Sequence, residues 1–544
     1  MRMVAAVDTG HGLVRHGGRK LSDYFVFNTD HKVIGIQYMV LSFLFFIFGG
    51  ILAELIRAEL ARPGTQFVGG SSYNQLFTIH GTIMIFLWII PAFAGLANYV
   101  IPLQLGANDM AFPKLNALAF WMLIPGAILL LVSFWVGGAE SGWTAYPPLS
   151  LQTGSGQTIW AIALQFIGFS SIFGAINFMV TIFNMRTTGM TLMRMPLMAW
   201  AIISTSIIII LGTPVLSAAL AMLAVSRILG ANFFAASGGG DPLMWQNLFW
   251  FYSHPAVYIM ILPGFGIISE VLPVFSRKPI FGYKLIAFSS LAIGIFGFLV
   301  WAHHMFTSGM DPFLRVPFMI TSMIIAVPTG VKIFSWLATI WGGKLRFTTA
   351  MMFALGFISL FVIGGLSGIF LASVPIDIHV QDTYFVVAHL HYVLFGGSVM
   401  ALYAGIYYWF PKISGRMLNE RLGQLHFWLN FVGFNLTFLP QHQLGLDGMP
   451  RRVADYAPEF ATLNLVSTLG AFLLAISTLP FIINVLVSLK RGAVAGPNPW
   501  RALGLEWTLA SPPPVHNFPV PPVVDSDPYG YGEQIIPPAQ PASV

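Results

Sequence analysis

Twelve long apolar stretches follow one another along the chain, separated by short polar segments. An α-helix rises about 1.5 Å per residue, so roughly 20 apolar residues cross the hydrocarbon core of a bilayer. The pattern predicts an all-α polytopic membrane protein with one bundle of twelve transmembrane helices. We expect the spans near residues 33–56, 74–101, 115–137, 157–184, 197–225, 245–272, 284–306, 314–341, 348–373, 383–410, 422–444 and 462–489.

The segments that flank the apolar stretches differ in character from the membrane domain, residues 33–489. Residues 1–32 are polar and show no secretory signal pattern, so we expect an N-terminal segment outside the membrane. Residues 490–544 contain SPPPVHNFPVPP, and this proline-rich composition is typical of an extended tail on the surface.

Composition supports the membrane assignment and orients the helices. Charged residues make up only 8% of the 544 residues, against roughly 25% in soluble domains. Nineteen of the 26 Lys and Arg residues lie in the terminal segments and the even-numbered loops, and six lie in the odd-numbered loops. Because positive residues favour the cytoplasmic side, we expect both termini in the cytoplasm and the chain in the inner (plasma) membrane, among lipids. The net charge of +6 follows from this rule and indicates no nucleic-acid partner.

Six of the 13 histidines lie in the predicted spans 2, 6, 7 and 10, at a common depth in the outer half of the membrane. Histidines that serve only local structure have no reason to share one depth, so the pattern predicts metal ligation. The chain has no cysteine, and every metal must therefore be held by nitrogen or oxygen. The six residues are His80, His254, His303, His304, His389 and His391.

Helical spacing divides these histidines into separate centres. His389 and His391 point about 200° apart on a helix, so they can hold two centres on opposite sides of it. One of them can pair with His80 across a closed, six-coordinate haem, and the other can bind a five-coordinate haem with an open face. The spacing does not decide which of the two pairs with His80.

Three imidazoles remain, from His254, His303 and His304, and they suit a copper ion with an open position. Neighbouring residues on an α-helix differ by about 100°. Joint ligation by His303 and His304 therefore requires a distorted helix end.

Several motifs resemble subunit I of the haem–copper terminal oxidases, over about residues 20–520. They are WFYSHPAVY, WAHHMFTSGMDP, AVPTGVKIFSW, DTYFVVAHLHYVLFGG, GANDMAFPKLN and GMPRRVADY. The resemblance implies reduction of dioxygen to water, coupled to proton pumping, with two haems of type A and one copper ion. It also implies ligand sets: His80 and His391 for the low-spin haem, His389 for the oxygen-binding high-spin haem, and His254, His303 and His304 for copper.

Tyr258 follows His254 by four residues, so both side chains face the same way on a helix. A buried tyrosine usually needs only a hydrogen-bond partner, but this one is expected beside a copper ligand. The resemblance implies a covalent link between the two side chains. It also implies that Tyr258 supplies an electron and a proton when the O–O bond breaks.

Lys332 lies in the inner half of span 8, where a charge costs roughly 3 kcal/mol on insertion scales. One interpretation is a lysine that snorkels to the inner surface, and the other is a proton relay from that side. Thr329 lies on the same face, three residues earlier. The family's lysine path matches both residues, with Tyr258 as its target and Ser269 as a mark of its entrance.

GANDMAFPKLN resembles the mouth of the family's second proton path. The resemblance gives Asp109 as its first group, with Asn98 and Asn116 lining it. Members of the family commonly end this path in a glutamate, where this chain has Ala256. The chain is similar to the aa3- and caa3-type subclass that carries a Tyr-Ser pair instead, here Tyr252 and Ser253.

The outer loops are expected to hold the haem edges. The resemblance places Trp143, Arg451 and Arg452 near the propionates, and it gives Arg57 a contact with the formyl group of the low-spin haem. Asp382 matches a ligand of a magnesium site. The family's neighbouring histidine is Gln381 here, which puts magnesium in doubt.

Partners and alternatives follow from the same resemblance. We expect a subunit II with a two-copper centre, a subunit III, and cytochrome c as the electron donor. A quinol-oxidising member of the family is the first alternative. Nitric oxide reductase is a second, but it usually lacks a tyrosine at Tyr258 and a lysine at Lys332. A secondary transporter would need no histidines at one depth.

Overall fold

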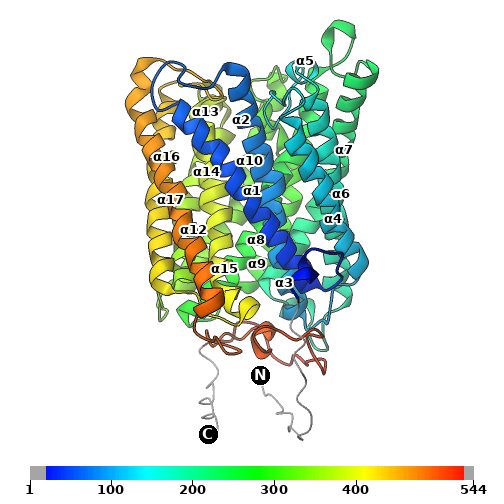
Figure 1. Ribbon diagram of the computed structural model, residues 1–544, viewed down its shortest axis with the longest axis vertical. Helices are drawn as coiled ribbons and strands as arrows, with labels where there is room; N and C mark the ends of the chain where they lie inside the picture. The colour runs from blue at the N-terminus through cyan, green and yellow to red at the C-terminus, as the bar shows by residue number, and fades with distance from the viewer. Residues whose placement is uncertain (1–19, 532–544) are drawn as a thin grey trace, which may run out of the picture.

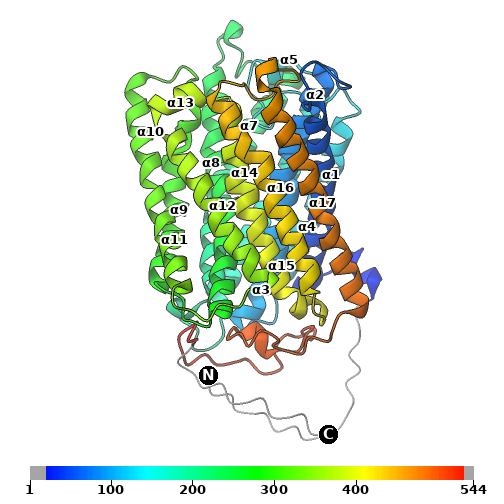
Figure 2. The same ribbon diagram turned by 90° about the vertical axis from the view of Figure 1, so that its left-hand side faces the viewer.

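The computed structural model describes residues 20–531 as a bundle of helices that lie side by side (Figures 1 and 2). Within these residues there are no β-strands, only two isolated bridges. Two short helices, α5 (Leu149–Gln152) and α13 (Val374–Val380), lie in loops. The long helices are α1 (His31–Glu59), α2 (Gly70–Ile83), α3 (Ile90–Leu105), α4 (Pro113–Ser133), α6 (Gly156–Asn184), α7 (Leu197–Leu229), α8 (Pro242–Ser276), α9 (Tyr283–Phe296), α10 (Pro312–Ile324), α11 (Ala326–Ile340), α12 (Thr349–Ala372), α14 (Tyr384–Val393), α15 (Met400–Ser414), α16 (Glu420–Leu446) and α17 (Ala461–Arg491).

Every predicted span is largely helical, which confirms the all-α membrane fold. Among the described residues, ten helices are long and apolar enough to cross a membrane. The segment Tyr283–Leu299 is shorter. The 27-residue helix α16 is not one of the ten, and it carries buried polar residues such as Asn430 and Gln441. The count of twelve spans therefore stays a prediction.

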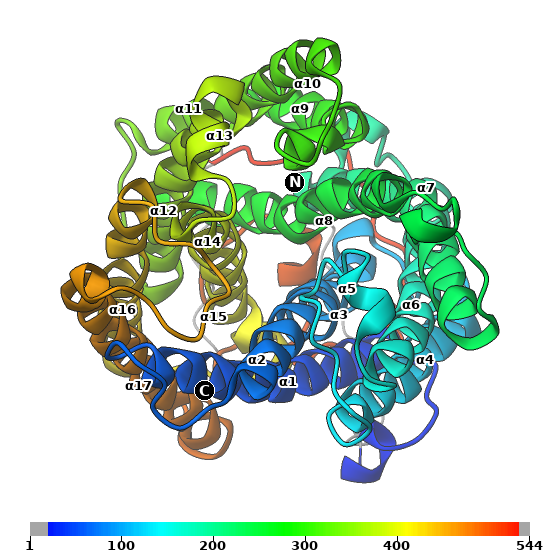
Figure 3. The same ribbon diagram turned by 90° about the horizontal axis from the view of Figure 1, so that it is seen from above.

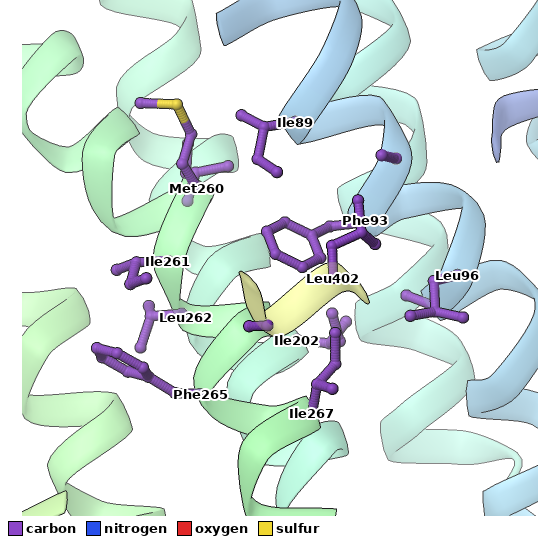
Figure 4. Packing of buried hydrophobic residues seen from close by; sticks show 14 of the residues in the cluster. Ile89, Phe93, Leu96, Ile202, Met260, Ile261, Leu262, Phe265, Ile267 and Leu402 are labelled. Atoms are coloured by element: carbon purple, nitrogen blue, oxygen red, sulfur yellow. The ribbon is translucent and has the colours of Figure 1, made fainter. Parts of the chain in front are cut away.

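Three central segments carry four of the six histidines. In the most apolar 18-residue stretch of each span, 89% of the residues are buried in α8, 83% in α2–α3 and 61% in α14–α15, against 44% or less in the other candidate spans. Figure 3 shows α8, α3 and α15 towards the middle of the bundle. Apolar side chains of these helices, including Phe93, Met260 and Leu402, fill the space between them (Figure 4). Polar groups on these helices are thus withdrawn from lipid.

The regular α-helix is interrupted beside the histidines. A π-helical turn, Met84–Ile89, follows His80, and another, Leu394–Val399, follows His391. Two 3-10 turns, Gly297–Leu299 and Trp301–Met305, replace the end of the predicted span 284–306. Such interruptions occur frequently at functional sites, because they change the direction of side chains.

Residues 492–531 cross one end of the bundle below the helices (Figures 1 and 2). We call this end the inner face, because the loops there are the predicted cytoplasmic ones. The segment has one 3-10 turn, Leu505–Thr508, and is otherwise irregular. It is not simply a surface chain, because Glu506 and Asn517 are buried beneath the helices.

Candidate metal centre

His254 of α8 meets His303 and His304 of the 3-10 turn Trp301–Met305. One ligand atom from each ring lies within 4.8 Å of the other two. The Nε2 atom of His304 is 3.2 Å from Nδ1 of His254 and 3.1 Å from Nε2 of His303. The turn brings two adjacent histidines to one point, which a regular α-helix would not do. This is the only cluster of three or more potential ligands found among the described residues.

The cluster fits a copper ion. Nitrogen atoms bound at about 2.0 Å to one tetrahedral ion lie roughly 3.3 Å apart, close to the distances between these rings. The His303 Nδ1 atom faces the Ser322 hydroxyl at 2.8 Å, which fixes the ring and leaves Nε2 for the metal. Trp250 stacks on the His304 ring with centroids 3.6 Å apart. Three imidazoles and no carboxylate are a donor set that copper accepts.

Tyr258 lies against His254, with ring centroids 4.7 Å apart and planes at 69°. His254 turns its Nδ1 atom towards His304, and its buried Nε2 atom has no hydrogen-bond partner among the described residues. The phenol is therefore in contact with the candidate copper site, as helical spacing predicted.

His80 and His391 face each other across a space that fits an iron atom. Their ring centroids are 6.4 Å apart and their planes differ by 14°. Imidazoles bound at about 2.0 Å on opposite sides of one metal would have ring centres roughly 6 Å apart. The Nδ1 atoms lie 2.8 Å from the carbonyl oxygens of Gly49 and Val387, so each ring has Nε2 left as a ligand.

His389 belongs to the other side of α14. Its Nδ1 atom lies 3.0 Å from the carbonyl oxygen of Gly364 and 3.0 Å from the Ser367 hydroxyl, both on α12. A Cβ atom at Gly368 would come within 2.9 Å of this ring, so the site needs glycine there. His389 is near enough to His254, His303 and His304 to interact electrostatically with each. A haem held by His389 would thus lie beside the copper cluster.

The outer arginines lie close to this region. Arg451 pairs with Asp382, with 2.8 Å between Nε and Oδ1. Arg452 lies over the Phe77 ring, and burial lowers the pKa of Arg452 to about 10. Trp143 contacts Trp250, which joins this loop to the copper cluster.

The Asp382 carboxylate is engaged by an arginine. Burial acts to raise the pKa of Asp382, but the ion pair with Arg451 outweighs it and holds that pKa below its usual value. The carboxylate is thus already neutralised by an arginine. It belongs to no cluster of three potential ligands among residues 20–531, and magnesium at Asp382 stays a prediction.

Arg57 lies in the last turn of α1 rather than in the predicted loop. Its Nη2 atom donates to the carbonyl oxygen of Asn464 at 2.8 Å and to Thr468 Oγ1 at 3.0 Å. Its buried Nε and Nη1 atoms have no hydrogen-bond partner among the described residues. A buried arginine with donors to spare fits a contact with an oxygen of a haem substituent.

Lys332 is fully buried on α11, and it does not reach the inner surface. Its Nζ atom donates to Ser290 Oγ at 2.6 Å and to the carbonyl oxygen of Ile286 at 2.9 Å, both on α9. Thr329, one turn away, donates to its own helix at Ile325. Ser269 is also fully buried and accepts a hydrogen bond from Trp336 Nε1 at 3.0 Å, so its hydroxyl does not open onto the inner face.

Asp109 lies at the inner face, between α3 and α4. Burial raises the pKa of its carboxyl to about 6, although the backbone N–H of Met110 donates to it at 2.7 Å. Asn98, on α3, lines a cavity of about 50 Å³ together with Ser170 and Ser206. This volume accommodates water, which needs roughly 10–15 Å³ by the same measure.

The rest of this predicted path consists of buried polar atoms. Both amide atoms of Asn116 and the Oδ1 atom of Asn98 lack hydrogen-bond partners among the described residues. The cavity extends to Ile259 of α8. Tyr252 and Ser253 are buried about two turns further along that helix, and Ser253 Oγ is also unpartnered. Ordered water is the usual partner for such atoms.

Sequence reasoning missed several residues that orient the histidines. Trp250 precedes His254 by four residues, so helical periodicity could have identified it. Ser322, Ser367 and the carbonyl oxygen of Gly49 come from other helices, and no spacing along the sequence indicates them.

Comparison with known proteins gives a consistent result. A family model described as Cytochrome C and Quinol oxidase polypeptide I matches residues 33–473. Cytochrome c oxidase subunit 1 of Synechocystis sp. is 61% identical over 518 residues, which cover 95% of this chain and 94% of that protein. The protein of the same name from Thermostichus vulcanus is 57% identical over 94% of this chain and 93% of its own length. A solved structure of a haem–copper terminal oxidase dimer has the same fold, with a TM-score of 0.74, 20% identity, and 86% and 85% of the two chains covered.

Proposed function

The chain belongs to the family of cytochrome c and quinol oxidase polypeptide I, and from this membership we propose that it passes electrons from cytochrome c to dioxygen and pumps protons across the plasma membrane. It is the catalytic subunit of a haem–copper terminal oxidase and an integral membrane protein. The observation that carries the detailed proposal is the cluster of His254, His303 and His304 beside His389.

We assign the low-spin haem to His80 and His391, the high-spin haem to His389, and copper to the three-histidine cluster. When bound, these groups would carry electrons and bind and reduce dioxygen. The protein holds five of the six imidazoles through the second nitrogen or a stacked ring, which keeps the ligand geometry fixed, and Tyr258 packs edge-on against the sixth, His254. Arg57 has free donors for a formyl oxygen, which supports haem A at the low-spin position.

Tyr258 is the proposed donor of a proton and an electron at the oxygen site. It contacts His254, and the loss of its hydroxyl proton would accompany oxidation of the phenol. The presence of Tyr258 and Lys332 argues against nitric oxide reduction, because that class usually lacks both.

Two inner routes would deliver protons. Lys332, with Thr329 and the buried hydroxyl of Ser269, would serve Tyr258. Asp109 would pass protons by way of Asn98, Asn116 and cavity water towards Tyr252 and Ser253. Each residue can bind or release a proton or order a water molecule in a region closed to lipid.

Electrons would arrive from a two-copper centre on subunit II, because this chain has no cysteine to build one. A subunit III is also proposed. Quinol is the second candidate donor, since the family description includes quinol oxidases. Oxygen consumption by the purified complex, measured with reduced cytochrome c and then with a quinol, separates the two.

An optical spectrum of the purified complex tests the haem assignment. We expect two haem signals in the reduced-minus-oxidised spectrum, of which only one shifts with carbon monoxide, because only His389 leaves an open face. A shift of both signals would contradict a closed site between His80 and His391. Absence of haem from folded protein would overturn the proposed function.

Tyr252→Phe is expected to lower turnover at least about tenfold, because the variant keeps the ring but loses the hydroxyl of a proton carrier. Oxygen uptake and protons pumped per electron in proteoliposomes are the measurements. Tyr403→Phe is the matched control: Tyr403 is equally buried, on α15, and its hydroxyl has no partner among the described residues. Equal activity of the two variants would remove Tyr252 from the route.

A further inference from the structure

The segment 492–531 is hydrogen-bonded to several helices at the inner face. Lys412 of α15 donates to the carbonyl oxygen of Leu509 at 2.6 Å, and Trp507 Nε1 donates to the Tyr408 hydroxyl at 2.8 Å. Near the other end of the segment, Tyr529 donates to Glu270 of α8. Between these anchors the segment runs under the start of α1, where Lys32 donates to the carbonyl oxygen of Val515 at 3.1 Å.

Asn517 is the most fully engaged side chain of this segment, and it is completely buried. Its Nδ2 atom donates to the carbonyl oxygen of Ala107 at 2.9 Å, and it is 3.2 Å from that of Asn108. Its Oδ1 atom accepts a hydrogen bond from Lys32 Nζ at 2.7 Å. The backbone N–H of the next residue, Phe518, donates to Asn108 Oδ1 at 3.0 Å.

Only an amide satisfies this arrangement. The Nδ2 atom also lies 2.9 Å from Nε2 of His31, whose Nδ1 atom faces the carbonyl oxygen of Asn98 at 2.7 Å. If His31 carries its proton on Nδ1, it donates to Asn98 and accepts from Asn517. The Nδ2 end of the Asn517 side chain is therefore surrounded by hydrogen-bond acceptors, and its Oδ1 end faces the Lys32 cation. An aspartate at this position would place a negatively charged oxygen against those acceptors.

The turn that Asn517 holds leads directly into Asp109. The groups that act on this carboxyl are Asp30 and Lys32 at the start of α1, together with backbone N–H groups. Lys32 and Asp30 are themselves paired at 3.2 Å. Asn517 thus binds both the turn before Asp109 and the lysine that acts on it. Through His31 it also touches the backbone of Asn98, whose side chain lines the cavity.

We propose that Asn517 is a positioning residue, whose amide holds the Ala107–Asn108 turn in place and thereby holds Asp109 at the inner mouth of its proton route. The inference rests on the proposed function, because it assumes that Asp109 takes up protons. The segment 492–531 then contributes to the proton route, in addition to packing against the inner ends of the helices.

The test uses the purified complex in proteoliposomes. Asn517→Ala is expected to lower turnover and protons pumped per electron, with turnover falling by up to about tenfold, because a small misplacement of a reacting group is costly. Asn517→Asp keeps the acceptor for Lys32 but loses the Nδ2 donor, so we expect a similar loss of turnover. This variant serves as the test if Asn517→Ala impairs assembly of the complex. Asn498→Ala is the matched control, because the Asn498 side chain bonds, among the described residues, only to the backbone of Ala502 in the same segment.

Two readouts separate positioning from a merely structural role. In an Asp109→Asn background, Asn517→Ala should cause no further loss of turnover, since both changes act on one step. In the otherwise unchanged enzyme, release of the turn would expose Asp109 and lower the pKa of its carboxyl from about 6. The fall of turnover on the alkaline side should therefore begin at lower pH.

Additive losses in the double variant, or an unchanged pH profile, would overturn the inference. So would normal turnover and pumping in both Asn517 variants, while Asp109→Asn still slows the enzyme. If Asp109→Asn itself changes nothing, the proposed route through Asp109 fails, and the role of Asn517 fails with it.

Discussion

Replacement of His303 by alanine is expected to remove one copper ion per complex and to lower oxygen reduction by more than about 100-fold. Loss of a residue that only orients a metal ligand costs 10–100-fold in many sites, so loss of a ligand should cost more. The two remaining rings, His254 and His304, would leave an incomplete donor set. The copper-to-iron ratio by elemental analysis and the rate of oxygen consumption are the measurements.

Two further variants make this result specific. Ser322→Ala removes only the hydroxyl that faces His303 Nδ1 at 2.8 Å, so it should weaken copper binding by about tenfold and keep part of the activity. His379→Ala changes an exposed histidine of α13 and should keep both copper and activity. Full copper content in the His303→Ala complex would show that the cluster is not the copper site.

Lys332→Met is expected to lower turnover at least about tenfold while haem and copper contents remain normal. Methionine fills a similar space in the apolar interior but carries no exchangeable proton. Ser290 Oγ and the carbonyl oxygen of Ile286 would each lose one hydrogen-bond donor, although Ser290 still donates to Ile286, so a modest loss of thermal stability should accompany the kinetic effect. Steady-state oxygen uptake, corrected for haem content, measures the change.

Lys412→Met provides a matched control for a buried lysine. Lys412 is fully buried on α15, and its Nζ atom binds carbonyl oxygens of the segment 492–531. Its replacement should lower thermal stability and leave turnover per haem nearly unchanged. If Lys332→Met turns over normally, the relay through α11 is wrong, and burial of this lysine needs another reason.

Much of the fold could be predicted because membrane helices follow a local rule. An apolar run of the right length must form helix, since its backbone has no water to bind. The rule does not predict which polar side chains are buried inside the bundle, as in α16, or where a helix changes type, as after Phe296. An apolar run in the sequence reveals neither the burial of these polar side chains nor the change from α-helix to 3-10 helix.

The histidines were predictable in part for the same reason. A shared depth is a property of the sequence once the spans are known, and the structure brings His254, His303 and His304 together. Their orientation is not local, because Ser322 and Gly364 belong to other helices. The burial of Asn517 was equally invisible, since its proline-rich surroundings indicate only an extended chain.

The contact between Asn517 and His31 also has a consequence for the order in which the molecule is made. The two residues are separated by 486 positions, so the ribosome synthesises His31 long before Asn517. The six candidate ligands end at His391 and can gather earlier, as domains form during synthesis. The surroundings of Asp109 are therefore among the last parts of the molecule to form. A chain that ends before Asn517 would retain the six candidate ligands but lack the hydrogen bonds that hold the turn before Asp109.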